Sequence, residues 1–406
     1  MHHVVYVAPY LAGNTLTCLE RMMAMPDVRL GVITHEPIER FPAKMRAALG
    51  GHYRVSDCLD PAALSEACRA FAGEWGRVDR LIGFLEQMQE ALATARDAVG
   101  IPGMGSKAAS NFRDKNQMKA VLRAAGLPVA RQRLIRSGAD ALSFVEAVGY
   151  PIVLKPIAGM GSKNTMRAST PEELYAALNI LLPSPERPIQ GEEFITGSEH
   201  TFESVSIGGK VVWSSTSYYL PGPLKVLETP WMQYCVLLPR QTIPPHATNF
   251  DALNARALKA LGMETGLSHM EWFIRPDGSP VISEVGARPP GVHLMPMMGL
   301  AHGVDMWDAW VKLMIRGEFS IPERKAAVGV AFFRAQGPGR VVKNVEGVEA
   351  AKAAVGKWVV NSRLPRVGQP RSEHYEGEGY AIVRHPTTEG AVHALRTMIT
   401  TIKVRA

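Results

Sequence analysis

The first hundred residues alternate short apolar runs with amphipathic segments. An apolar run of four to six residues is typical of a buried strand, whereas a longer segment with apolar positions three and four apart is typical of a helix. Strands that alternate with helices at this spacing predict a parallel α/β sheet. The expected strands are 4–7, 30–34 and 80–84, and the expected helices are 16–25, 60–73 and 87–99.

The rest of the chain has a different pattern. Strands are expected at 151–155 and around 164–167, followed by paired strands at 201–207 and 210–218, and no sequence repeat is visible. Beyond about residue 320 a few short strands and one helix are expected. The expected helices are 171–181, one within 244–262, 301–316 and 387–400.

Composition narrows the class of protein. Hydrophobic residues make up 46% of the 406 residues and charged residues 20%, which describes an ordinary globular chain of two or three domains. The 45 basic residues exceed the 38 acidic residues by seven. This excess is spread along the chain, so a nucleic-acid partner is not expected. We expect a weak attraction for anionic small molecules instead.

The cysteines and the apolar runs indicate a cellular location. The four cysteines form no CxxC pair and no Cys/His metal-binding spacing, so they are expected to be reduced thiols. No apolar run approaches the roughly 18 residues of a membrane span, and the sequence MHHVVYVAPY does not have a signal-peptide pattern. We therefore expect a cytoplasmic protein that does not bind membranes.

A lysine at the start of a predicted helix is the first candidate for chemistry. The segment 114–126 has apolar residues on one helical face, with Asp114 as the expected N-cap and Gly126 at its end. Lys115 then lies in the first turn, where the helix dipole disfavours a positive charge. Two interpretations are open: Lys115 is solvated at a small cost, or it faces a ligand.

A second lysine precedes a glycine-rich turn. Lys155 ends an apolar strand, and the sequence AGMGSK follows at 158–163 before the next strand. The backbone N–H groups of such a turn can surround an anion, although the segment could also be a simple hairpin. It is not a P-loop, because no GK[ST] sequence begins a helix here.

The most informative segment is a predicted hairpin at 268–288. Asp277-Gly278 lies between two alternating apolar runs, which predicts a two-residue turn. That turn places Glu271 directly opposite Glu284, with Cβ atoms roughly 4.5–5.5 Å apart. The same alternation places on this face His269, Phe273, Ile282 and Gly286, with Arg288 just beyond.

Two opposed carboxylates require an explanation. Like charges facing each other destabilise a sheet unless one is protonated or a cation lies between them. Oxygen ligands without sulfur suit Mg²⁺, so Glu271 and Glu284 are candidate metal ligands. The alternatives are that both are solvated on an exposed face, or that a longer turn shifts the register by one residue and separates them.

Taken together, these motifs resemble the ATP-grasp superfamily of ligases over about residues 100–316. The family's first lysine, before an amphipathic helix, matches Lys115, and its second lysine, at the end of a strand, matches Lys155. The family's glycine-rich lid loop matches Gly159, Gly161 and Ser162. The resemblance therefore implies ATP as a substrate.

The remaining family motifs follow in the same order. The hinge that binds adenine matches Glu192, Glu193, Phe194 and Ile195, and the acid for the ribose hydroxyls matches Glu199. The family's metal-binding acids match Glu271 and Glu284, which implies Mg²⁺, with Mn²⁺ as an alternative. The phosphate-binding and catalytic arginine matches Arg288, and His269 is assigned with it as catalytic.

One position departs from the family pattern. Many members carry Asn two residues after the second acid as a further metal ligand, and this chain has Gly286 there. A water or substrate oxygen would have to replace that ligand, or the chain belongs to a subgroup without it. His269 and the run EVGARPPG at 284–291 look most like the carboxylate–amine ligases that join amino acids.

The resemblance implies a fold and a reaction. The fold is an α+β ATP-grasp fold with a parallel α/β domain at 1–113, an ATP-binding region at 114–320 whose lid spans about 130–190, and a closing domain at 321–406. A carboxylate would be activated as an acyl phosphate and then attacked by an amine, with release of ADP and phosphate. Two alternative functions stay open. The protein is an ATP-grasp enzyme with a different acceptor (bicarbonate, thiol or hydroxyl), or it is a non-catalytic ATP-binding module. A homodimer is expected on base rates.

Overall fold

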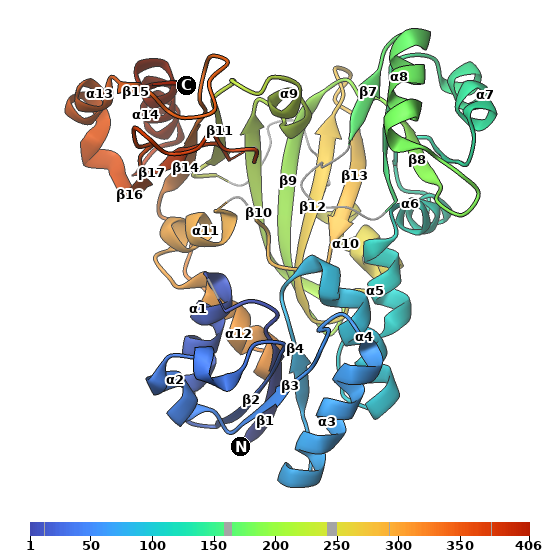
Figure 1. The fold of residues 1–406 in the computed structure, drawn as a ribbon, viewed down its shortest axis with the longest axis vertical. Coiled ribbons are helices and arrows are strands. Elements are labelled where there is room, and N and C mark those ends of the chain that lie inside the picture. Colours follow the sequence, from blue (N-terminus) through green and yellow to red (C-terminus); the bar gives the residue numbers. More distant parts are fainter. Residues whose placement is uncertain (12, 158–164, 242–249, 292, 375) are drawn as a thin grey trace.

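The computed structural model describes residues 1–11, 13–157, 165–241, 250–291, 293–374 and 376–406. Within these residues the fold contains three main sheets, and a short pair of strands lies beside the largest of them (Figure 1). Among the described residues, none of the helices combines the length and the apolar character that crossing a membrane requires.

The N-terminal part is the predicted parallel sheet, which lies at the bottom of Figure 1. Its strand order is β3-β2-β1-β4, and all three pairings are parallel. The strands are β1 (His2–Val7), β2 (Val28–Thr34), β3 (Gly51–Arg54) and β4 (Arg80–Ile82). The helices between and after them are α1 (Asn14–Met23), α2 (Ala43–Ala48), α3 (Pro61–Trp75) and α4 (Gln89–Val99).

Two helices lead from this sheet to the next, α5 (Ser106–Arg113) and α6 (Lys115–Ala124). Asp114 ends the first helix and caps the second, because its side chain accepts hydrogen bonds from the backbone N–H groups of Asn116 and Gln117. The predicted N-cap is confirmed. Met118 and Leu122 are buried on the face that packs into the protein.

A small antiparallel sheet forms a separate lobe at the upper right of Figure 1. Its order is β5-β8-β6-β7, and the helices α7 (Gly138–Val148) and α8 (Pro171–Leu181) pack on it around a core of their own. The strands are β5 (Gln132–Ile135), β6 (Ile152–Pro156), β7 (Met166–Ala168) and β8 (Ile189–Glu193). The lobe occupies the range expected for the lid.

The largest sheet has eight strands in the order β13-β12-β9-β10-β11-β14-β17-β16, and all of its pairings are antiparallel. Strands from both sides of residue 320 belong to it, and the domain limits at 113 and 320 stay predictions. The strands are β9 (Ser198–Ile207), β10 (Lys210–Leu220), β11 (Tyr234–Leu238), β12 (Gly266–Ile274), β13 (Pro280–Gly286), β14 (Ala327–Phe333), β16 (Val359–Arg363) and β17 (Gly379–His385). Beside it, β15 (Asn344–Glu346) pairs with β18 (Lys403–Arg405).

Two helix predictions in this part were wrong. The single helix expected at 301–316 is divided, because Gly303 takes a left-handed conformation with φ of 77° and Asp305 caps a new helix. The helix α13, which lies beyond residue 320, was not predicted. The helices are α9 (Pro223–Glu228), α10 (Phe250–Leu261), α11 (Leu294–His302), α12 (Met306–Arg316), α13 (Val348–Val355) and α14 (Thr388–Thr401).

The hairpin between β12 and β13 has a longer turn than predicted. The backbone N–H of Arg275 donates to the carbonyl of Ser279 at 2.9 Å, so the loop has three residues, 276–278, and not two. Gly278 has a φ of 82°, which suits the left-handed position that ends such a loop. The prediction of a two-residue Asp277-Gly278 turn was therefore wrong.

A β-bulge offsets this extra turn residue. The register shifts between Glu271 and Trp272, leaving Ser283 as the additional residue on β13, and Glu271 lies opposite Glu284 as predicted. The bulge also changes the face of Ile282, which pairs with Trp272 and packs with it in the core. The expectation that Ile282 shares the face of the two glutamates was wrong.

We expect Trp272→Ala to lower the free energy of unfolding by about 3–5 kcal/mol, because it leaves a large cavity in a packed core. Trp272 is completely buried, and its ring stacks on Phe250 with centroids 3.7 Å apart. Urea unfolding measures this change. The control is Trp231→Ala, whose side chain is 53% exposed and whose loss should alter stability by no more than about 0.5 kcal/mol. Equal effects of both substitutions would contradict the assigned core.

Candidate active site

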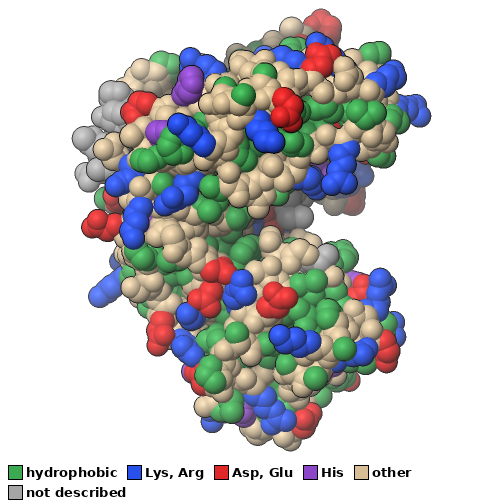
Figure 2. Space-filling model, turned by 90° about the vertical axis from the view of Figure 1, so that its left-hand side faces the viewer, with side chains coloured by type: hydrophobic (Ala, Val, Ile, Leu, Met, Phe, Trp, Pro, Cys, Tyr) green, Lys and Arg blue, Asp and Glu red, His purple; other side chains and the backbone are tan. Residues whose placement is uncertain are grey.

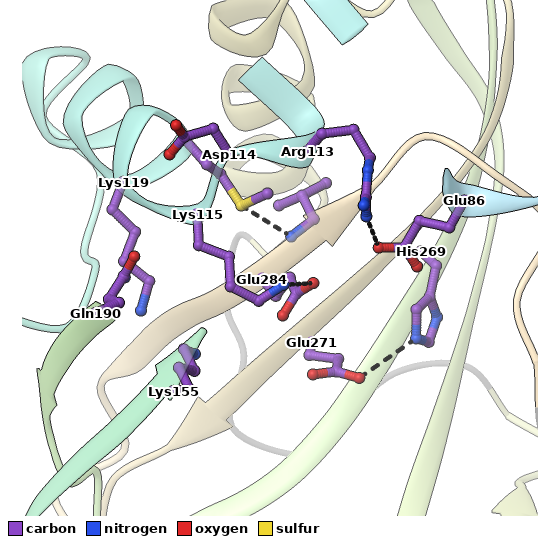
Figure 3. Close-up of polar contacts among 12 residues, drawn as sticks. Glu86, Arg113, Asp114, Lys115, Lys119, Lys155, Gln190, His269, Glu271 and Glu284 are labelled. Atoms are coloured by element: carbon purple, nitrogen blue, oxygen red, sulfur yellow. Dashed lines mark hydrogen bonds and ion pairs between the residues drawn. The ribbon is translucent and has the colours of Figure 1, made fainter. Parts of the chain in front are cut away.

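An open cavity lies where the small sheet, the large sheet and helix α6 meet. It brings together side chains that are far apart in the sequence (Figure 3). The predicted residues among its lining are Lys115, Lys155, Glu192, Glu193, Phe194, Ile195, Glu199, Glu271, Glu284 and Arg288. Gly159, Gly161 and Ser162 lie outside the described residues.

The two opposed glutamates at this cavity are flanked by positive groups. The ammonium of Lys115 lies 2.7 Å from Oε1 of Glu284 (Figure 3), and Lys115 is only 6% exposed. The interpretation of Lys115 as a solvated lysine was therefore wrong. Helix α6 instead points the lysine from its first turn into the cavity.

His269 lies beside Glu271 rather than on the cavity lining. Its Nδ1 is 2.8 Å from Oε1 of Glu203, and its Nε2 is 3.7 Å from Oε1 of Glu271. Burial alone would lower the pKa of His269, but its hydrogen bond to Glu203 and the nearby Glu271 raise it to about 9. The ring is therefore a cation at neutral pH. Burial of Glu271 raises the pKa of its carboxyl group, but the charge and hydrogen bond of His269 outweigh burial, so the pKa of Glu271 is lowered.

Two lysines surround one carboxylate on β8. Oε1 of Glu192 lies 2.6 Å from the ammonium of Lys119 and 2.9 Å from that of Lys155. Burial favours the protonated carboxyl, but the two positive charges dominate and hold the pKa of Glu192 at about 2. For Lys119 burial dominates, and it lowers the pKa of the ammonium to about 8.

Sequence analysis missed Lys119, although a signal for it exists. Lys115 and Lys119 are four residues apart in α6, so they lie on one face of the helix. That face also carries the buried Met118 and Leu122. A lysine on the apolar face of an amphipathic helix requires a buried partner, and here the partner is Glu192.

Arg288 is fixed by a residue from the N-terminal part of the chain. Its Nε lies 2.8 Å from Oε2 of Glu86, and the guanidinium of Arg113 binds the other oxygen of the same carboxylate. Glu86 is 6% exposed and precedes α4. Burial lowers the pKa of Arg288, but the negative charges of Glu86 and Glu284 have the larger effect, so the pKa is raised overall. No motif in the sequence marked Glu86 or Arg113.

The hinge residues after Glu192 are held in a defined position. Glu193 accepts hydrogen bonds from the backbone N–H and from Nε of Arg131, at 2.9 and 2.6 Å. The backbone N–H of Phe194 donates to the carbonyl of Pro151. Burial, together with the charge of Glu271, raises the pKa of Glu199 to about 8. This carboxyl group therefore retains its proton at neutral pH.

The carboxylates at the cavity fit a divalent cation. Within the described ranges, no group of three or more His, Cys, Asp or Glu side chains has the arrangement of a complete metal centre. Mg²⁺ commonly takes only one or two carboxylates and completes its shell with water and phosphate oxygens. Glu271 and Glu284 face each other across two strands, and burial together with the charge of Glu271 raises the pKa of the nearby Glu199. A cation would offset the repulsion between the opposed carboxylates.

Comparisons with known proteins show which sequences and folds this chain resembles. Residues 114–184 match the family model of the carbamoyl-phosphate synthase L chain, ATP binding domain. An uncharacterized protein y4rH from Sinorhizobium fredii is 24% identical over 360 residues, covering 85% of this chain and 68% of that protein. The L-arginine-specific L-amino acid ligase of Bacillus subtilis is 24% identical over 245 residues, covering 59% of this chain and 58% of the ligase.

Other relatives and structures extend the comparison. The alanine–anticapsin ligase of Bacillus subtilis strain 168 is 25% identical over 252 residues, which cover 56% of this chain and 52% of that enzyme. The chain thus spans about half the length of these two curated ligases. A crystal structure of the L-amino acid ligase from Bacillus licheniformis covers 100% of this chain with a TM-score of 0.76, at 20% identity and 98% coverage of that structure.

A second solved structure has a similar fold. Carboxyaminoimidazole ribonucleotide synthase from Aspergillus clavatus, complexed with ATP, matches 98% of both chains with a TM-score of 0.70 and 18% identity. The resemblance predicted from the sequence is confirmed. The chain has the ATP-grasp fold, and its residues 114–184 are similar to the ATP binding domain of the carbamoyl-phosphate synthase L chain.

We expect Lys119→Met to destabilise the protein by about 3–5 kcal/mol, because it removes one of the two charges that offset the buried Glu192. The double variant Lys119→Met/Glu192→Gln should be less destabilised than the sum of the two single variants, since the pair is then removed as a unit. Unfolding free energies of the four proteins in this double-mutant cycle measure the coupling. Additive effects would show that the contact contributes no stability.

Proposed function

We propose that this protein is an ATP-dependent carboxylate–amine ligase that activates a small carboxylic acid as an acyl phosphate and transfers the acyl group to an amine. The observation that carries the proposal is the single cavity into which α6, β6, β12 and β13 bring two lysines, two opposed glutamates and an arginine. Amino acids are the proposed substrates, because two curated relatives are named as an L-amino acid ligase and an alanine–anticapsin ligase.

In this proposal, the end of β8 and the residues after it bind the nucleotide. The hinge residues 192–195 contact the adenine, and Glu199, whose carboxyl retains its proton, can donate a hydrogen bond to a ribose hydroxyl. Lys115 and Lys155 bind the phosphates. Both lysines already contact carboxylates within the cavity, so their positions are fixed before the nucleotide enters.

Glu271 and Glu284 would hold Mg²⁺, which supplies the positive charge that offsets the phosphate oxygens during transfer. His269 contacts Glu271 and not the cavity, so we assign it as a positioning residue rather than a catalytic one. It keeps the carboxylate ionised and oriented. Gly286 lies opposite His269 in the ladder, and the proposed metal site therefore consists of two carboxylates without an amide ligand.

The chemistry proposed needs no nucleophile from the protein. The substrate carboxylate attacks the γ-phosphorus of ATP, ADP departs, and the amine then displaces phosphate from the acyl carbon. Arg288, held by Glu86 at 2.8 Å, stabilises the negative oxygen that forms when the amine attacks. Catalysis then rests on positioning and electrostatics. The homodimer and the cytoplasmic location stay predictions from the sequence.

The direct test measures ADP, phosphate and AMP with Mg-ATP and pooled amino acids. Release of ADP and phosphate that depends on an amino acid, without AMP, is the expected result, and mass spectrometry of the mixture identifies the product. Formation of AMP would contradict the acyl-phosphate mechanism. Turnover only with bicarbonate, a thiol or an alcohol would assign a different acceptor, and tight ATP binding without any turnover would indicate a binding module.

We expect Glu284→Gln to reduce ATP turnover at least about a hundredfold, since the loss of one metal-binding charge weakens stabilisation of the transferred phosphoryl group. The free energy of unfolding checks that the fold is intact. The matched control is Glu349→Gln in α13, whose side chain is 86% exposed and whose turnover should be unchanged. Near-normal ADP release by the Glu284 variant would show that the metal site has been misplaced.

A further inference from the structure

A second cavity lies between the N-terminal sheet and the large sheet. It is bounded by β4 and α4 on one side and by the start of β12 and by α12 on the other. In Figure 1 these elements meet below the lower ends of the central strands. Figure 2 shows a deep hollow on the surface between the upper and lower parts of the molecule. Of the residues that line it, the reaction proposed above uses only Arg288.

Its charged lining is entirely basic. Arg80, Arg96 and Arg288 line this cavity, and no Asp or Glu is among its described lining residues. Positive groups that converge on a space with low-dielectric walls create a potential that attracts anions. The first cavity is the opposite case, because several glutamates line it.

Arg96 is the most unusual of these residues. It is 5% exposed, and its Nε and one terminal nitrogen donate to the backbone carbonyls of Leu81 and Met104. Neither of these two hydrogen bonds goes to a carboxylate. Burial lowers the pKa of Arg96 to about 10, and the charge of the neighbouring Asp97 offsets only part of this effect.

A purely structural role explains only part of this arrangement. Arg96 ties β4 to the turn before α5, which accounts for two of its nitrogens. Arg80 is not needed for that link. Its guanidinium donates to the carbonyl of Asp79, and Arg80 lines both this cavity and a neighbouring hollow that Asp27 and Glu318 also line.

The remainder of the wall is largely apolar. The side chains opposite the arginines belong to Met263, Leu267, Trp310 and Met314. An inorganic anion would leave this surface unfilled, whereas a carboxylate with a short branched apolar chain could contact both walls. Pockets for small organic ligands commonly combine an apolar lining with a few converging polar groups.

We propose that this cavity is a second binding site, which takes a small carboxylate with an apolar chain and holds its charge between Arg80 and Arg96. As a site for an effector it goes beyond the proposed ligase reaction, and as a subsite for the amine substrate it rests on that reaction. It adjoins the first cavity through Arg288, which lines both. The occupant is therefore either a separate effector or the carboxylate end of the amine substrate, and these two sources share the same binding chemistry.

The test is calorimetric titration of the full-length protein with 4-methylpentanoate, with Mg²⁺ and ADP present throughout. We expect saturable binding that Arg80→Gln weakens at least about tenfold, the effect of losing a charge-assisted hydrogen bond. Met314→Trp should weaken it as well by filling the cavity from the opposite wall. The matched control, Arg69→Gln at an exposed position of α3, should bind as the wild type does.

The neutral 4-methylpentanamide separates charge from shape, and it should bind at least about tenfold more weakly than the acid. No binding of 4-methylpentanoate, or binding that both cavity variants leave unchanged, would overturn the proposal. In turnover assays, competition with the amine would identify the occupant as the amine substrate's carboxylate, and a change in kcat without competition would identify an effector. Because calorimetry needs no turnover, failure of the proposed ligase reaction leaves this test valid.

Discussion

The structure depends on positive side chains that neutralise carboxylates within the protein. Glu192 is balanced by Lys119 and Lys155, Glu284 by Lys115, Glu86 by Arg113 and Arg288, and Glu203 by His269. In each case the partner comes from a different element. Removing one member would leave an unpaired buried charge, which is far more costly than the net contribution of the pair. The ion pairs therefore specify how α6, the small sheet, the large sheet and the N-terminal sheet fit together.

Much of the fold could be predicted because it depends on local patterns. The alternation of apolar runs and amphipathic segments predicted the parallel sheet, and Asp114 capped its helix as expected. The turn between β12 and β13 shows the limit. Asp277-Gly278 indicates a tight turn, but the sequence does not distinguish a two-residue loop from a three-residue loop that is followed by a bulge at Ser283. Glu271 meets Glu284 either way, whereas Ile282 changes face.

The site was predictable where its residues belong to motifs and unpredictable where tertiary contacts create it. Lys115 and Lys155 stand at recognisable positions, at a helix start and a strand end. Glu86, Arg113 and Glu203 acquire their roles only when segments up to about two hundred residues apart come together, as in the 2.8 Å contact of Glu86 with Arg288. Periodicity describes one element at a time, so it does not reveal which partner a buried charge will have.

The distribution of charge also explains why Arg288 stands where it does. Among the described residues, the ion pair of Glu271 within 4 Å is with His269, at 3.7 Å, and the pKa of the neighbouring Glu199 is raised by burial and by the charge of Glu271. The first cavity thus keeps a surplus of negative charge, which suits a metal ion that carries phosphates. The second cavity has a surplus of positive charge, since none of its described lining residues is acidic. Arg288 lines both and is held by Glu86 between them. One guanidinium that Glu86 holds therefore stands between the cavity proposed for the metal and nucleotide and the cavity proposed for a carboxylate.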